Sequence, residues 1–169
     1  SNGEETQQVP LNILQDPRSS ASMPDLQAQY EFVISGRDKM NEINKTIREI
    51  RKVNSQLSDL KIKIELEDLK AEIDRLIEQS GNIEKALYQT KNRSSQDPLN
   101  YPIRLNNKYG HVIALATIGF NRPTEPMYGV KEELETLINA ELLKWENTQK
   151  ELKSLNSKIQ KAEVPFIKW

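Results

Sequence analysis

Two long stretches of this chain repeat apolar residues at heptad spacing, and this constrains the fold more than any other feature. In the cleaner stretch the positions step alternately by four and three: Ile62, Leu66, Leu69, Ile73, Leu76, Ser80, Ile83 and Leu87. The other stretch keeps the same seam, with Asn54 as its polar member: Val33, Gly36, Met40, Ile43, Ile47, Ile50 and Leu57. Such steps place side chains on one stripe of an α-helix. The sequence therefore predicts two long helices, each burying one face against other helices.

Capping residues and turn residues set the expected ends of these two helices. Ser22 is a favourable N-cap residue, Pro24 is tolerated in the first turn, and Asp25 suits the positive helix N-terminus. We therefore expect the first helix to span residues 24–59. Only Ser58-Asp59 offers turn chemistry before the second helix begins. We expect a tight helical hairpin there, and one continuous helix is the alternative.

Two more helices are expected in the second half of the chain. Apolar residues are dense after Pro102, which predicts a short third helix that is nearly surrounded by protein. They are Ile103, Leu105, Tyr109, Val112, Ile113, Leu115, Ala116 and Ile118. Thr124 is expected to cap a fourth helix that runs to about residue 162. Its apolar stripe consists of Val130, Leu134, Leu137, Ile138, Leu142, Trp145, Leu152, Leu155 and Ile159.

These elements predict an all-α fold, an up-down-up-down four-helix bundle with an N-terminal extended arm. The bundle is expected over residues 23–163, and residues 164–169 form an apolar tail that cannot extend the helix through Pro165. Residues 1–22 form the arm and linker, in which Val9, Leu11 and Ile13 alternate as in a short strand. One interpretation is a disordered or loosely docked arm. The other is the last strand of a preceding β domain.

The residue types that support catalysis or metal binding are scarce in this sequence. There is no cysteine, and the one histidine, His111, follows Lys108 rather than a glutamate at the spacing of a di-metal site. We therefore predict no catalytic residue, no metal site and no cofactor. The net charge of −1 argues against a nucleic-acid partner. No apolar run of about 18 residues is present, so no membrane span is expected.

The segment 91–108 is the remaining candidate for function, because it is a polar break between heptad-patterned helices. Aspartate and asparagine side chains bond local backbone groups, prolines favour turns, and an arginine can bind a carboxylate through two hydrogen bonds. The candidate docking residues are Asp97, Asn100, Tyr101, Arg104, Asn106 and Asn107. The segment is either a docking surface for another domain or a self-satisfied connector that crosses one end of the bundle.

Several parts of the chain resemble one protein family. The run Ala86-Leu87-Tyr88-Gln89-Thr90-Lys91-Asn92 to Lys108 is one part, and Arg122-Pro123-Thr124 is another. Asp16-Pro17-Arg18, Arg37-Asp38-Lys39 and the segments 25–30 and 47–51 agree as well. Together they resemble the C-terminal region of large bacterial proteins with Asp-box (BNR) repeats and sortilin-like β-propellers, classed as glycosyl hydrolases. The similarity covers roughly residues 9–160.

The resemblance implies a helical region that follows the propeller and a small β domain in an exported protein, which is periplasmic, on the cell surface or secreted. The hydrolase activity would belong to the propeller, so no catalytic residue is carried over to this chain. The implied function is a non-catalytic accessory domain that docks on other domains of its parent protein. The alternatives are a homo-oligomerising coiled coil, which leaves the oligomeric state open, and a cryptic hydrolase with a polar pocket near His111.

Overall fold

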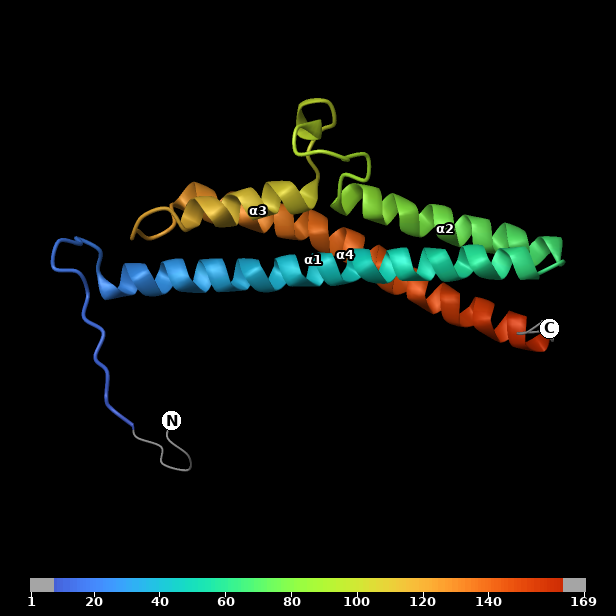
Figure 1. Cartoon of the computed structure of the whole chain (residues 1–169), viewed down its shortest axis with the longest axis horizontal. Coiled ribbons are helices and arrows are strands. Elements are labelled where there is room, and N and C mark those ends of the chain that lie inside the picture. Colours follow the sequence, from blue (N-terminus) through green and yellow to red (C-terminus); the bar gives the residue numbers. More distant parts are fainter. Residues whose placement is uncertain (1–7, 163–169) are drawn as a thin grey trace, which may run out of the picture.

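The structure is a computed structural model of the whole chain, and it describes residues 8–162 (Figure 1). The four α-helices are α1 (Met23–Lys63), α2 (Glu67–Leu87), α3 (Leu105–Ala116) and α4 (Glu125–Lys161). One short 3-10 helix, η1 (Asp97–Leu99), lies between α2 and α3. The described residues contain no β-strand. The predicted all-α fold with four helices is confirmed.

The helices α2 and α3 lie end to end along α1, as Figure 1 shows. Lys61 near the end of α1 donates to Asp74 of α2 at 2.6 Å, whereas Gln29 near its start donates to the carbonyl oxygen of Ala116 in α3 at 2.8 Å. As the residue number increases along α2 and α3, the residue contacted on α1 has a lower number. Both helices therefore run antiparallel to α1. The helix directions therefore do not follow the strict up-down-up-down order that was predicted, because α3 runs in the same direction as α2.

The long helix α4 packs beside both α2 and α3 and completes the bundle. The hydroxyl of Tyr109 on α3 donates to Glu135 at 2.6 Å, and Lys158 donates to Glu72 on α2 at 2.7 Å. These contacts make α4 antiparallel to α2 and α3. A cross-section at any level of the bundle therefore cuts three helices: α1, α4 and either α2 or α3.

The core fills the space among these helices in two adjoining clusters. One lies mainly where α1, α3 and α4 meet, and the other lies where α1, α2 and α4 meet. The first consists of Phe32, Ile43, Ile47, Ile50, Ile83, Leu87, Tyr109, Ile113, Ala116, Leu134, Ile138, Leu142 and Trp145. The second consists of Leu57, Ile64, Leu69, Ile73, Leu76, Leu155 and Ile159. Each fully buried Leu or Ile contributes roughly 1.5–3 kcal/mol, so these clusters drive folding.

The hairpin between the first two helices is confirmed, but its expected place was wrong. Helix α1 continues to Lys63, and the turn consists of residues 64–66 rather than Ser58-Asp59. The Ser58 hydroxyl bonds the carbonyl of Asn54 at 2.8 Å inside the helix, so this serine does not end it. Ile62 is 85% exposed as a result, and Ile64, at 3% exposure, is buried in the core.

The third helix is less buried than its apolar density predicted. Tyr109 and Ile113 face the core, whereas Leu115 is exposed and Ile118, just beyond the helix, is 70% exposed. The cause is the three-helix cross-section, which leaves the outer face of α3 without a covering helix. The prediction of a nearly surrounded helix was therefore wrong.

The predicted cap at the start of the bundle is present, and the arm before it is extended. The Ser22 hydroxyl accepts from the backbone N–H of Asp25 at 3.3 Å, as expected for an N-cap residue. Thr124 is the N-cap residue of α4, although its side chain makes no capping hydrogen bond. Val9, Leu11 and Ile13 are exposed, and a preceding β domain stays a prediction. The tail at 164–169 lies outside the described residues.

Candidate docking loop

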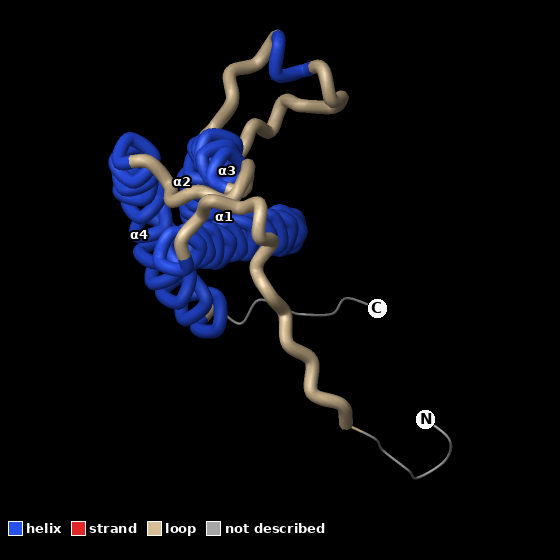
Figure 2. The backbone as a smooth tube through the Cα atoms, turned by 90° about the vertical axis from the view of Figure 1, so that its left-hand side faces the viewer, coloured by secondary structure: helices blue, strands red, loops and turns tan. Residues whose placement is uncertain are grey.

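Residues 88–104, which we name the central loop, leave the bundle between the end of α2 and the start of α3. Figure 1 shows the loop rising from the middle of the bundle, and Figure 2, which looks along the helices, shows it standing clear of them. It therefore does not cross an end of the bundle, as the connector interpretation expected. Because α2 and α3 point the same way, the loop also does not reverse the chain.

Asp97 organises the tip of the central loop. Its carboxylate accepts hydrogen bonds from the backbone N–H groups of Arg93 and Ser94, the latter at 2.8 Å, and from the Ser94 hydroxyl at 3.0 Å. Its carbonyl oxygen accepts from the N–H groups of Asn100 and Tyr101, both at 2.9 Å. The hydrogen bond from the Arg93 N–H is the main cause that lowers the pKa of Asp97. Asp97 thus bonds the chain on both sides of itself, with its carboxylate at residues 93–94 and with its carbonyl oxygen at residues 100–101.

Gln89 holds the root of the loop closed. It is 4% exposed, its Nε2 donates to the carbonyl oxygen of Pro102 at 2.8 Å, and its Oε1 accepts from the N–H of Lys91 at 3.3 Å. The Lys91 ammonium lies over the Tyr101 ring, 5.5 Å from its centroid. Sequence reasoning missed Gln89, because a polar residue two positions beyond the heptad residue Leu87 gives no sign of burial.

The candidate residues from the sequence fall into two groups in the structure. Asp97, Asn100 and Tyr101 come together around η1 at the tip. Arg104 is the exposed N-cap residue of α3 and forms no ion pair within residues 8–162, so its binding of a carboxylate stays a prediction. Asn106 is buried, and its Oδ1 accepts from the N–H of Asn107 at 2.8 Å, which satisfies one donor of the first turn of α3.

Helix α1 also contacts the start of the loop. Arg51 donates to Glu84 at 2.6 Å, and its guanidinium lies 5.1 Å from the centroid of the Tyr88 ring. Tyr88 is the first residue of the central loop, so this contact joins the start of the loop to α1.

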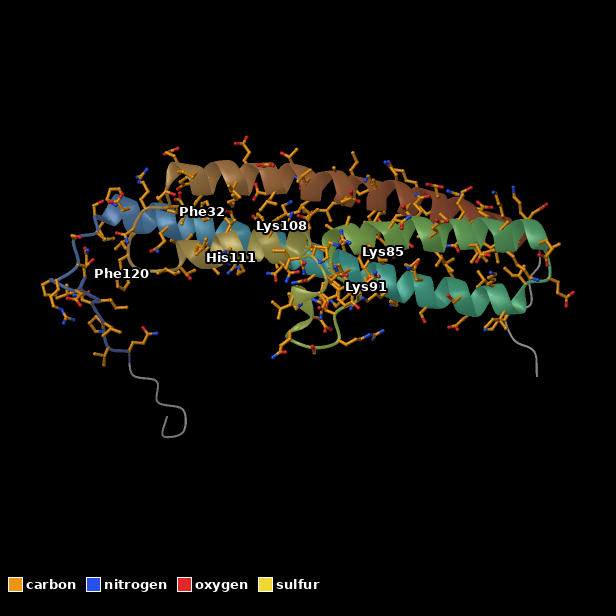
Figure 3. The ribbon with its side chains drawn as sticks, turned by 90° about the horizontal axis from the view of Figure 1, so that it is seen from above. Phe32, Lys85, Lys91, Lys108, His111 and Phe120 are labelled. Carbon is orange, nitrogen blue, oxygen red and sulfur yellow. The ribbon has the colours of Figure 1, made fainter. Side chains whose placement is uncertain are left out.

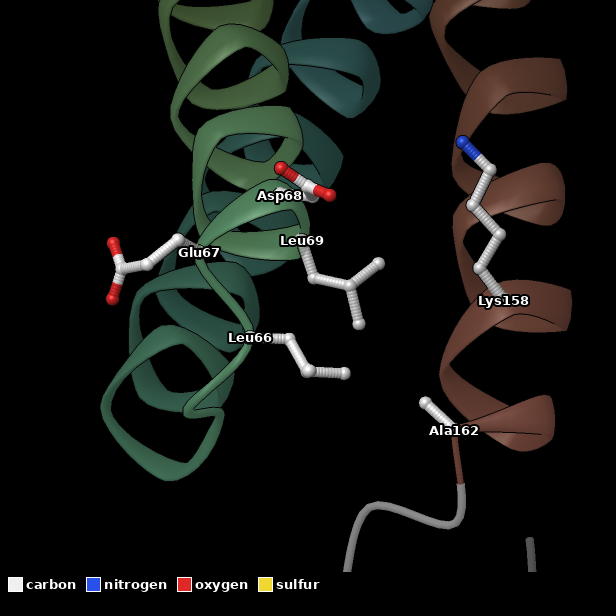
Figure 4. Close-up of a pocket in the computed structure, with 6 residues that line it drawn as sticks. All are labelled: Leu66, Glu67, Asp68, Leu69, Lys158 and Ala162. Atoms are coloured by element: carbon white, nitrogen blue, oxygen red, sulfur yellow. The ribbon is translucent and has the colours of Figure 1, made fainter.

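Two pockets lie elsewhere on the bundle, and both are open to solvent. One, of about 600 Å³, lies between α2 and α4 and is lined by Gln79, Asn82, Ile83, Ala86, Glu141, Lys144 and Asn147. The other, of about 360 Å³, lies at the end of the bundle (Figure 4). Leu66 and Leu69 extend toward its interior, while the Glu67 carboxylate points away from it. Neither pocket is lined by His111, which lies exposed on the outer face of α3.

The described part of the chain shows neither a metal-binding cluster nor a membrane span. Within residues 8–162, no group of three or more His, Asp or Glu side chains could hold a metal ion. In the same residues, no helix combines the length and apolarity needed to cross a bilayer. Comparison with known proteins finds no matching family model, curated protein or solved structure.

Proposed function

We propose that this chain is a non-catalytic helical domain that docks on another protein domain through its central loop. The observation that carries the proposal is the shared direction of α2 and α3. Two helices that continue one line need only a short break between them, yet seventeen residues separate Leu87 from Leu105. Loops longer than about 12–15 residues are uncommon in compact domains, and the ordered ones are usually functional. The excess length supports a role outside the bundle.

The internal bonding of the loop supports the same proposal. Asp97 and Gln89 hold the tip and the root in one conformation through backbone contacts. A surface that is ordered before binding loses less conformational entropy when a partner docks. Two apolar side chains are also presented to solvent, because Leu99 is 87% exposed and Ile103 is 45% exposed. The loop thus offers both a fixed shape and apolar area to a partner.

The proposed partner is the preceding part of a longer exported protein. This rests on the resemblance to the C-terminal region of Asp-box propeller proteins, in which hydrolase activity would belong to the propeller. The extended residues 8–22 leave the bundle at the end opposite the α1–α2 turn (Figure 1). They would link the bundle to the domains before it. The helical domain would then act as an accessory that stabilises or positions the propeller.

A double substitution in the longer protein tests the proposal. Asp97→Ala with Arg104→Ala removes the organiser of the tip and an exposed cation at the root, and leaves the net charge unchanged. We expect docking to weaken, so that limited tryptic cleavage at Arg18 in the linking segment becomes faster. Asp59→Ala with Lys63→Ala is the matched control, because both side chains are exposed far from the loop. If the loop variant and the control are cleaved as slowly as the natural protein, the docking proposal is wrong.

The homo-oligomerising coiled coil is the second candidate, and the burial of its seams disfavours it. Ile43 and Ile50 of α1 and Ile73 and Leu76 of α2 are completely buried within a single chain. A seam that packs against α2, α3 and α4 has no free face for a second copy. The same residues thus serve the intramolecular core.

A further inference from the structure

Charge is unevenly distributed along this chain. Between Glu84 and Glu125 there are six basic residues, and Asp97 is the single acidic one. This stretch therefore carries a net charge of +5, although the whole chain carries −1. The Asp97 carboxylate is also bonded to the backbone of its own loop. The central loop and α3 thus form the electropositive part of an otherwise acidic protein.

Five of these cations lie in the central loop or in the helix turns beside it, and we name them the basic surface. They are Lys85, Lys91, Arg93, Arg104 and Lys108. Lys85 lies in the last turn of α2, Lys91 and Arg93 lie in the loop, and Arg104 and Lys108 lie at the start of α3. Figure 3 looks onto this side and shows Lys85, Lys91 and Lys108 near the loop, with His111 farther along α3. The five residues are exposed.

The five cations of the basic surface make no ion pair within residues 8–162. Many other cations of the bundle are paired between helices, as Lys61 is with Asp74 and Lys158 is with Glu72. Unpaired like charges that are held close together repel each other, and a complementary acidic surface would relieve that repulsion. The arrangement therefore favours an acidic ligand over a neutral one.

We propose that the basic surface binds an acidic segment of a partner protein, one that carries apolar residues beside its carboxylates. The inference rests on the proposed docking function and names the chemistry of the partner. The carboxylates would contact the five cations, while apolar side chains would contact Leu99 and Ile103, which are exposed in the same loop. Complementary charge would speed the encounter and fix the orientation, and the apolar contacts would lengthen the lifetime of the complex.

The surroundings of the basic surface favour an acidic protein segment over nucleic acid. A nucleic-acid strand needs a continuous row of cations along its phosphates. In one direction α2 bears the exposed residues Glu67, Asp68 and Glu78, which would repel phosphates. In the other direction, along α3, the exposed residues include His111, Leu115 and Ile118, and none of the exposed residues from 109 to 118 is a lysine or an arginine. The positive area is therefore short, and it suits a compact acidic segment.

A binding measurement on the complete 169-residue chain tests this inference. The probe is a short fluorescent peptide of aspartate, glutamate and leucine, and its binding is followed by anisotropy. The triple variant Lys85→Gln, Lys91→Gln, Lys108→Gln should bind the peptide about tenfold or more weakly. The control Lys150→Gln, Lys153→Gln, Lys161→Gln changes the net charge equally on exposed positions of α4, and it should bind like the natural chain. Circular dichroism checks that both variants remain helical.

Three results would overturn the inference. The first is no binding of the peptide to the natural chain, and the second is an equal loss in the variant and its control. The third is tighter binding of a mixed-sequence single-stranded oligonucleotide than of the peptide. Because the peptide assay uses this chain alone, its outcome is independent of docking to the longer protein. If docking to the longer protein persists but the peptide does not bind, the proposed function stands and the inference of an acidic partner is wrong.

Discussion

At the scale of single residues, Asp97 determines the shape of the central loop. Its carboxylate is the acceptor for two backbone N–H groups and one hydroxyl, so the charged form is favoured when the loop is folded. The N–H groups of Arg93 and then of Ser94 are the leading causes that lower its pKa below the ordinary value of 3.8. A lowered pKa in the folded state means that this stabilisation is present above pH 3.8 and is lost as the pH falls through the folded pKa.

The expected result is a pH-dependent loop inside a bundle that stays helical. The amide signals of Arg93 and Ser94 should stay constant down to about pH 4 and then shift together as the carboxylate is protonated. Nuclear magnetic resonance spectra recorded from about pH 6 to pH 2 would follow these amides. Asp97→Asn keeps the size of the side chain and should remove the transition. A transition centred at or above the ordinary aspartate pKa would contradict this account.

Gly36 permits the close approach of α1 and α3. A β-carbon built at this position would overlap the side chain of Ile113, whereas one built at Gly81 on α2 would meet nothing within 4 Å. Gly36→Ala should therefore destabilise the chain by about 1–3 kcal/mol, because the helices must separate or Ile113 must move. Gly81→Ala should stabilise it by up to about 1 kcal/mol through helix propensity. Urea unfolding measures both changes, and equal stabilisation by the two substitutions would refute the close packing.

At the scale of elements, heptad spacing predicted the helices well because it depends on local geometry. The two polar members of the seams, Asn54 and Ser80, even meet in the structure, where the Ser80 hydroxyl donates to the Asn54 Oδ1 at 2.6 Å. The end of α1 was misplaced because Ser58 bonds the helix backbone instead of ending the helix. No local signal distinguishes these two uses of a serine.

The arrangement of the elements was less predictable than their existence. Dense apolar residues around Ile113 indicated a helix, but they did not show how many helices would cover it. Likewise, the polar segment at 91–108 was identified as a break, but its residues carry no information about the direction of the next helix. That direction follows from the packing of Tyr109 and Ile113 against α1 and α4, which is a tertiary contact. The role of Gln89 depends on the same folded geometry.

The central loop should be nearly dispensable for the stability of the bundle. Most of its side chains are exposed, so replacing residues 93–100 with a Gly/Ser segment of equal length removes little buried apolar area. We expect a loss of less than about 1 kcal/mol in the free energy of unfolding, measured by urea denaturation. Leu76→Ala, which removes a completely buried side chain, should instead cost about 2–5 kcal/mol. A comparable loss in the two variants would show that the loop is part of the core.

At the scale of the whole molecule, the structure predicts a monomer. The seams that suggested a coiled coil are buried within one chain, where α2 and α3 together take the place of a single partner helix. Light scattering at dilute concentration should therefore give a mass near 19.5 kDa. A concentration-dependent mass of twice this value would favour the homo-oligomer instead.

The most direct test of the docking function is a calorimetric titration of this chain into the separately produced propeller that we propose precedes it in a longer protein. We expect saturable binding that is lost when residues 93–100 are replaced by the Gly/Ser segment. The same binding should be retained in the Asp59→Ala, Lys63→Ala control. Absence of heat at high concentration, or equal binding by the loop-replaced chain, would contradict the claim that the central loop is a docking surface.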